Sequence, residues 1–483
     1  MTIDDLLQRA VERGPERVAL TWRGLRLSFA ELDRAVDAAV ARLGDVGVST
    51  DDRVAIVAGN VPALAVLLFA TWRAGAVALP LNDRLRSDDL GSAFAATVPT
   101  ITAFVERADA GADADRRARL LETTRIERRQ PAGDAAPTTT ASAVPAPPGT
   151  GLILTTSGST GTPKPVLVAH QRELDTAASL TDRLSLTPDD VTVLAVSLTH
   201  AFGLSCFLAA IASGGESILV DSTTSTGPLL DAASTATVLH GSPTLFTSVA
   251  SAARPLPPRV RTGLSAGAAA PPGLLERLDD AGLTICNLYG MTELGATAAT
   301  RPDDPAPVRW TTAGTALPGH ELRIVDGELF VRGRHVTAGY YGQPERTARA
   351  FTEDGWFRTG DTGTLDDAGN LTVLGRLDDI VSIAGFTVSP AEVEACLLGH
   401  PDAIATVVVA VPDARLGHRL SAFVVPRPRA TVSPRDLVGH VRQRLAGYKV
   451  PYRVEFMDDL PRLANGKPDR HTLRARAIEA ERR

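Results

Sequence analysis

The stretch Thr155-Thr-Ser-Gly-Ser-Thr-Gly-Thr-Pro-Lys-Pro165 follows a short apolar run, residues 151–154. Its glycines allow a ligand to approach the backbone closely, and its hydroxyls, N–H groups and Lys164 can surround phosphate oxygens. It is not a Walker A loop, because that motif needs glycine before the lysine and serine or threonine after it. Here Pro163 and Pro165 flank Lys164. The stretch predicts an anion-binding loop after a strand, with a polar hairpin turn as the alternative.

Strand-like and helix-like segments alternate on both sides of this loop, which indicates an α/β fold. Ser28 and Glu31 form a capping-box pattern at the start of a helix that ends before Gly44. A segment rich in proline, alanine and threonine, residues 131–149, predicts a loop or linker. The other expected elements are strands over residues 53–58, 76–81, 151–156, 191–196, 217–220 and 322–325 and a helix over residues 63–74.

The pattern changes after Arg376 to a smaller unit of βαβ type. We expect strands over residues 405–411 and 420–425 and helices over residues 391–398 and 434–445. The fold prediction is therefore an α/β protein with a large, multi-subdomain N-terminal α/β domain, residues 1–376. A small, mobile C-terminal α+β domain, residues 377–483, follows it.

The composition is that of an enzyme-sized globular protein rather than a disordered or fibrous one. The 483 residues include 50 basic and 56 acidic side chains, for a net charge of −6. No overall positive field is available for nucleic acid or an anionic membrane, so we expect neither as a partner. Three cysteines without a CxxC pair argue against a disulfide framework. The acidic N-terminus and the absence of a long apolar run predict a cytoplasmic protein.

Lysine is rare in this chain, which makes each lysine notable. Only Lys164, Lys449 and Lys467 occur, against 47 arginines. A lysine retained against such a bias is expected where a compact, flexible ammonium is needed rather than a planar guanidinium. Chance retention is the alternative.

Six further motifs follow the loop in order: Asn287-Leu-Tyr-Gly-Met-Thr-Glu293, Gly327-Glu-Leu-Phe-Val-Arg-Gly333, Gly339-Tyr-Tyr341, Gly355-Trp-Phe-Arg-Thr-Gly-Asp361, Gly375-Arg-Leu-Asp-Asp379 and Asn465-Gly-Lys467. The ordered set resembles the AMP-forming adenylate superfamily of acyl-CoA and aryl-CoA synthetases, nonribosomal peptide adenylation domains and luciferases. The resemblance covers nearly the whole chain. It implies ATP and Mg²⁺ as cofactors, a small carboxylic acid as substrate and CoA as co-substrate, with acyl-AMP as intermediate.

By this resemblance the catalytic residues are Lys467, Thr292, Glu293 and His200. Tyr289 would stack on adenine, Thr292 would bond the α-phosphate, and Glu293 would ligate Mg²⁺, which prefers carboxylate oxygen. Lys467 resembles the lysine that reaches from the small domain to the substrate carboxylate and the α-phosphate, where an ammonium stabilises developing charge. Taken singly, each could be an ordinary turn or surface residue.

Asp361 resembles the family carboxylate that accepts both ribose hydroxyls, and Arg376 resembles its partner at the ribose and phosphate. Asp378 matches the hinge between the two domains. Lys449, in Gly447-Tyr-Lys-Val-Pro451, fits another family motif but receives no role. The expected nucleotide-binding residues are Thr156, Ser157, Gly158, Ser159, Thr160, Gly161, Lys164, Gly267, Ala268, Asn287, Tyr289, Gly290, Asp361, Val373 and Arg376.

The segment Ser197-Leu-Thr-His-Ala-Phe-Gly-Leu204 resembles the family segment that lines the acid pocket. Relatives that activate α-amino acids commonly carry aspartate at the position of Ala201, and alanine cannot pair with a substrate ammonium. The remaining candidate wall segments are uncharged, so we expect an apolar acid, with aromatic slightly favoured over fatty. The expected pocket residues are His200, Ala201, Phe202, Gly203, Ser265 and Gly290.

The acceptor of the acyl group is less defined than the adenylate. Ser382 stands where many family members have lysine, and Gly417-His418 replaces a more usual Gly-Glu. Both lie in the small domain. CoA, a carrier-protein phosphopantetheine and an amine all remain open as acceptors, so an amide synthetase is one alternative. A nucleotide-binding protein with an inactive site is the non-enzymatic alternative.

Overall fold

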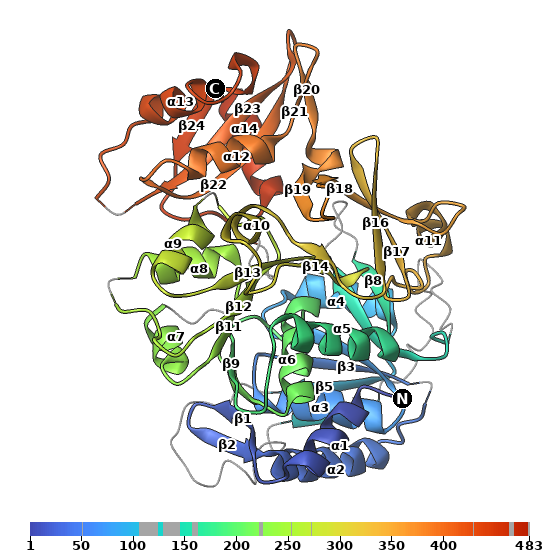
Figure 1. Ribbon diagram of the computed structural model, residues 1–483. Coiled ribbons are helices and arrows are strands. Elements are labelled where there is room, and N and C mark those ends of the chain that lie inside the picture. Colours follow the sequence, from blue (N-terminus) through green and yellow to red (C-terminus); the bar gives the residue numbers. More distant parts are fainter. Residues whose placement is uncertain are drawn as a thin grey trace.

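The computed structural model describes residues 1–50, 52–105, 124–128, 145–156, 163–221, 226–252, 254–271, 273–427, 429–462 and 468–481, without the side chains of residues 378, 387 and 481. It is a mixed α/β protein with a large N-terminal domain and a small C-terminal domain, as the sequence predicts (Figure 1). In Figure 1 the small domain, in orange and red, caps one end of the large one.

The first layer of the large domain is a six-stranded sheet in the order β6-β5-β3-β4-β7-β8. β3 and β4 pair in parallel and are buried along their whole length, which explains the uninterrupted apolar runs over residues 54–58 and 77–81. α2 begins with the predicted capping box, because Ser28 Oγ accepts from Glu31 N–H at 3.2 Å. The elements of this layer are α2 Phe29–Asp45, β3 Arg53–Ala58, α3 Pro62–Arg73, β4 Val77–Asn82, α4 Ser87–Thr97, β5 Ile101–Val105, β6 Thr124–Arg128, β7 Thr150–Thr156 and β8 Lys164–Ala169.

A second sheet has the order β11-β9-β10-β1-β2, and α5 and α6 pack together beside it (Figure 1). α6 is almost entirely apolar and buried, so it forms part of the interior between the layers. The elements here are α1 Asp4–Arg13, β1 Val18–Trp22, β2 Leu25–Ser28, α5 His170–Arg183, β9 Val191–Leu194, α6 Ala201–Ser213, β10 Glu216–Leu219, α7 Thr226–Ala233, β11 Val238–His240 and α8 Pro243–Ala250.

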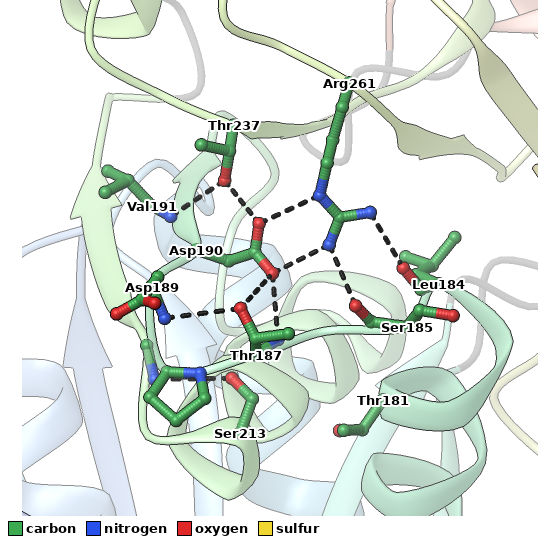
Figure 2. A network of polar contacts seen from close by, with 12 residues as sticks. Thr181, Leu184, Ser185, Thr187, Asp189, Asp190, Val191, Ser213, Thr237 and Arg261 are labelled. Carbon is green, nitrogen blue, oxygen red and sulfur yellow. Dashed lines mark hydrogen bonds and ion pairs between the residues drawn. The ribbon is translucent and has the colours of Figure 1, made fainter.

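A polar network fixes the starts of the strands in this second sheet (Figure 2). Asp190, just before β9, accepts from Arg261 Nη2 at 2.7 Å and from Thr237 Oγ1 at 2.6 Å. Arg261 also donates to the carbonyls of Leu184 and Ser185 after α5. Burial alone would raise the pKa of Asp190, but these hydrogen bonds and the arginine charge lower it. The network lies at the amino ends of these strands, so their carboxyl ends remain available for a binding site.

Two further sheets complete the large domain. One has the order β12-β13-β14-β15, and the other is an antiparallel sheet in the order β16-β17-β18-β19. Their elements are β12 Gly263–Ser265, α9 Leu274–Asp280, β13 Ile285–Met291, β14 Gly295–Ala299, α10 Ala306–Thr311, β15 Thr315–Ala316, β16 His320–Val325, β17 Glu328–Gly333, α11 Pro344–Ala350, β18 Phe357–Leu365 and β19 Leu371–Arg376.

The small domain contains a βαβ unit, because β23 and β24 are parallel and α13 connects them; β24 is not among the strands predicted from the sequence. β22 instead pairs with β23 as an antiparallel hairpin. The small domain has two apolar clusters, one that includes Val408 and Leu437 and another that includes Phe423. The elements are η2 Leu377–Asp379, β20 Val381–Ile383, β21 Phe386–Val388, α12 Pro390–Leu398, β22 Ala403–Asp413, β23 Gly417–Pro426, α13 Pro434–Arg442, η3 Gly447–Lys449, β24 Arg453–Phe456 and α14 Arg470–Glu481.

The sequence-based elements are confirmed, with boundary shifts of a few residues at strand and helix ends. Most of the predicted linker, up to residue 144, lies outside the described residues. The domain boundary after residue 376 stays a prediction. Within the described part of the chain, no helix has the length and apolar character needed to cross a membrane.

Candidate active site

The turn between β13 and β14 carries Thr292 and Glu293 and is fixed by its backbone. Four successive carbonyls, from residue 291 to residue 294, each accept a hydrogen bond. Three of the donors come from distant parts of the chain, so this short turn is held from several sides. The donors are Leu294 N–H to Met291 O at 2.9 Å, Arg172 Nη1 to Thr292 O at 2.7 Å, Thr337 N–H to Glu293 O at 2.7 Å and His320 Nε2 to Leu294 O at 3.1 Å.

Two glycines allow the turn to close. A Cβ on Gly290 would lie 2.3 Å from the carbonyl oxygen of Gly295. Gly295 has φ +70°, in the left-handed region that side chains disfavour. Gly290, which the sequence predicts as a binding-site residue, is therefore needed for close backbone contact between β13 and β14.

The Glu293 carboxylate is buried, with 4% of the residue exposed. Tyr340 Oη donates to Glu293 Oε1 at 2.9 Å. Burial and the charge of Glu293 raise the pKa of Tyr340, so its hydroxyl keeps its proton and remains a donor. Tyr340 also pairs with Val166 of β8. The Gly339–Tyr341 motif therefore connects Glu293 to the strand that follows the anion loop.

Asp361 lies on β18, opposite Arg376 of β19. One carboxylate oxygen accepts from Tyr289 Oη at 2.6 Å and the other from Arg376 Nη1 at 2.9 Å. Burial and the charge of Asp361 raise the pKa of Tyr289. Burial opposes the charge of Arg376, but Asp361 outweighs that effect and raises the pKa of the guanidinium. Three residues from three separate sequence motifs thus form one contact group.

The segments predicted to line the acid pocket meet at the carboxyl ends of the strands. Ser265, the last residue of β12, pairs with Gly241 on one side and with Asn287 of β13 on the other. The rings of Phe202 and His240 are 6.4 Å apart. His200 is the N-cap of α6, with Ala201 as its first residue. A Cβ on Gly203 would lie 2.2 Å from Ser197 O, which explains the glycine there.

The remaining predicted nucleotide residues are placed in part. Thr156 and Lys164 face each other across β7 and β8 at the two ends of the loop. Gly267 and Ala268 are exposed after β12. Val373 and Tyr289 border the same apolar cluster around Phe357. Outside the described residues lie Ser157, Gly158, Ser159, Thr160, Gly161 and Lys467, and the side chain of Asp378 is also not described.

Two family models match the chain. The AMP-binding enzyme family matches residues 7–341, and the AMP-binding enzyme C-terminal domain matches residues 392–467. The chain belongs to the AMP-binding enzyme family. It is 34% identical, over 98% of both chains, to a propanoyl:CoA ligase of Mycobacterium tuberculosis whose acyl group carries a methylated dioxo-octahydroindene ring.

Two other relatives define the range of this similarity. A feruloyl-CoA synthase of Amycolatopsis is 33% identical over 95% of this chain and 96% of its own. The amide bond synthetase McbA of Marinactinospora thermotolerans matches in structure with a TM-score of 0.82, at 27% identity over 98% of this chain and 99% of its own. This AMP-binding enzyme is thus a ligase of the acyl- and aryl-CoA synthetase type.

Several contacts of this AMP-binding enzyme are missed by sequence reasoning. Tyr340 occurs in a quoted motif without a role, and Arg172, Thr337 and His320 are not singled out at all. Arg172 lies on a helix with ordinary amphipathic spacing, so only its complete burial, visible in the structure, distinguishes it. Lys449 forms an ion pair with Glu392 at 2.6 Å, which gives this unassigned lysine a structural partner.

Proposed function

We propose that this AMP-binding enzyme activates an apolar monocarboxylic acid as acyl-AMP and transfers the acyl group to CoA, with aromatic acids favoured over fatty ones. The observation that carries the proposal is the Tyr289–Asp361–Arg376 contact group, because a half-buried aromatic residue, an acceptor-only carboxylate and a cation held by that carboxylate suit the adenosine and phosphate of ATP. The adjacent Thr292–Glu293 turn supplies groups for the α-phosphate.

In the first half-reaction, an oxygen of the substrate carboxylate attacks the α-phosphorus of ATP, and the bond to pyrophosphate breaks. Asp361 would orient ATP by accepting hydrogen bonds from its ribose hydroxyls. Thr292 would donate to the α-phosphate, and Lys467 would bring an ammonium to the transferring centre. Holding both reactants in line accounts for most of the rate enhancement expected from such a site.

Glu293 would hold Mg²⁺. Its carboxylate is fixed by Tyr340 through one oxygen, and a single carboxylate together with substrate phosphates is a usual environment for this ion. Among the described residues no group of three or more metal-ligating side chains occurs. The remaining ligands would therefore come from phosphate oxygens and water. Bound Mg²⁺ would neutralise part of the phosphate charge.

The acid class follows from the pocket segments. Ala201 offers no charge to a substrate ammonium, and burying an unpaired ammonium costs several kcal/mol. The similar feruloyl-CoA synthase and propanoyl:CoA ligase are both named for acids with a ring on a short carboxylate chain. These names support a ring-bearing acid for this chain as well.

For the second half-reaction we propose that the small domain, residues 377–483, turns about Asp378 relative to residues 1–376. A thiol then attacks the acyl carbonyl and AMP leaves. Gly375, three residues before Asp378, has φ +150°, a backbone conformation that side chains disfavour, so glycine provides conformational freedom beside the proposed hinge. Since the reaction uses ATP and CoA, we place the enzyme in the cytoplasm.

The similarity to an amide bond synthetase favours one alternative, in which an amine takes the place of the thiol. A carrier-protein thiol is the other alternative acceptor. The test is a panel of carboxylic acids assayed for pyrophosphate release, followed by mass analysis of products formed with CoA, amines or a carrier protein. If none of the acids in the panel causes pyrophosphate release, the adenylation proposal is contradicted. If the product is an amide, the acceptor is an amine and not CoA.

A further inference from the structure

α5 carries a charged pair in the interior of the large domain. Arg172 and Glu173 are neighbours in sequence, with 2% and 0% of their side chains exposed. Arg172 Nε and Nη2 both donate to Glu173 Oε1, at 3.1 and 2.9 Å. A buried ion pair of this kind rarely stabilises a fold more than well-packed apolar side chains of the same size would. The pair is therefore notable for the hydrogen bonds that it forms in defined directions, more than for a contribution to stability.

The two ends of the pair contact the two halves of the proposed site. Arg172 Nη1 donates to the carbonyl of Thr292, in the turn that carries Glu293, at 2.7 Å. Glu173 Oε2 accepts from Ser205 Oγ at 3.1 Å. Ser205 belongs to α6, one helical turn after Ala201, which is the first residue of this helix and part of the predicted acid-pocket segment.

The turn also packs directly on Arg172. A Cβ on Gly295 would lie 3.5 Å from Arg172 Nε and 3.4 Å from Thr176 Oγ1. The turn, the ion pair and α6 therefore form one continuous set of contacts across α5. A displacement of α6 by the acid would be transmitted to the carbonyl of Thr292 through groups that have little room to relax.

We propose that the Arg172–Glu173 pair is a positioning device. It couples α6, which begins in the predicted acid-pocket segment, to the turn that carries Thr292 and Glu293, so that the substrate carboxylate and the α-phosphate are held in the geometry that the reaction needs. This inference rests on the proposed adenylation function. Arg172 and Glu173 touch neither ATP nor the acid in this proposal. They act through the backbone of Thr292 and through Ser205.

The test compares a paired replacement with a matched control. Arg172→Met together with Glu173→Met removes both charges, which avoids leaving one buried charge unpaired. The control is Arg183→Met, because Arg183 is a second buried arginine on α5 whose bonds go to Thr315 and Ala316 of β15 instead. Single-turnover pyrophosphate release is measured at saturating ATP and acid, with thermal unfolding in parallel.

The paired variant is expected to adenylate ~10²-fold more slowly at saturation, since a small misplacement of reacting groups costs about this much. Its KM for ATP should stay within about threefold of wild type, because the groups that contact ATP are intact. The factor by which the acid raises the affinity for a non-hydrolysable ATP analogue, measured by calorimetry, should fall towards one. Arg183→Met should lower the unfolding midpoint without slowing the saturated rate.

A second variant keeps the proposal testable if the paired one does not fold. Ser205→Ala cuts only the contact to α6 and should slow saturated adenylation ~10-fold or more, the scale of one hydrogen bond to a charged group. A folded variant with the wild-type rate and coupling, or equal slowing by Arg183→Met, would overturn the positioning role. Wild-type protein that releases no pyrophosphate with any acid would refute the adenylation function instead, which separates the two failures.

Discussion

Replacing Asp361 with asparagine tests the assignment of the ribose site. A carboxylate has about four positions at which it can accept hydrogen bonds. In the structure Tyr289 and Arg376 each use one oxygen, which leaves two positions for the hydroxyls of a ribose. An amide has one acceptor oxygen and two N–H donors, so Asp361→Asn cannot accept from all four groups and presents a donor to at least one of them.

The magnitude follows from the number of bonds lost. Hydrogen bonds to a charged group contribute ~1.5–3 kcal/mol each. Losing both ribose bonds would cost ~3–6 kcal/mol, and the amide oxygen recovers part of this. We therefore expect kcat/KM for ATP to fall ~10²- to 10³-fold. Because the Arg376 side chain is 51% exposed, its ion pair with Asp361 contributes little to stability, and the variant should fold.

The assay is the initial rate of pyrophosphate release with ATP, 2′-deoxy-ATP and 3′-deoxy-ATP as substrates. Wild type should use each deoxy-nucleotide less well than ATP, whereas Asp361→Asn should discriminate much less. Asp366→Asn provides the control, because Asp366 lies in the turn of the same hairpin and, among the described residues, bonds within its own loop. A KM for ATP unchanged by Asp361→Asn, or undiminished discrimination, would refute the assignment.

Lys467→Ala should lower the rate of acyl-AMP formation ~10²-fold or more, while the rate of thioester formation from supplied acyl-AMP stays near wild type. Equal loss of both rates would show that Lys467 does not act in the first half-reaction alone. Asp378→Pro should slow thioester formation more than acyl-AMP formation, measured by rapid quench. Because of Ala201, phenylalanine and leucine should be far poorer substrates than benzoate-like acids in competition assays. Burial holds the pKa of His240 at about 3 and that of His320 at about 4, both below the usual 6.5. The contribution of each neutral histidine to the free energy of unfolding, measured with urea, should therefore be fully present above pH ~6.5 and should fall towards pH ~4 by ~1.4 kcal/mol per pH unit. In His240→Phe the decrease should be less steep.

The sequence predicts the elements of the fold where local chemistry determines them. The capping box at Ser28 and the apolar run over residues 54–58 of β3 are examples, since both are decided by neighbours in the chain. The antiparallel pairing of β22 with β23 was not predicted, because alternating apolar residues do not specify a strand's partner.

The motif series predicts which residues face the ligands but not how they contact one another. Tyr289 and Asp361 come from motifs 72 residues apart, and their 2.6 Å hydrogen bond depends on how two sheets meet. Arg172 and Glu173 could not be identified from sequence, because adjacent charges on an amphipathic helix are usually solvated. Only tertiary packing places both of them in the interior.

Most of the contacts that hold the turn at Thr292 go to its carbonyls. Side chains proposed to bind phosphate and metal have fewer positions left to fix the turn, because each hydrogen bond made within the protein competes with the ligand; Glu293 gives one oxygen to Tyr340. Hydrogen bonds to backbone carbonyls avoid this competition. Arg172, Thr337 and His320 therefore hold Thr292, Glu293 and Leu294 from behind. Because this arrangement fixes charge-bearing groups before the substrates bind, less reorganisation is needed during the reaction.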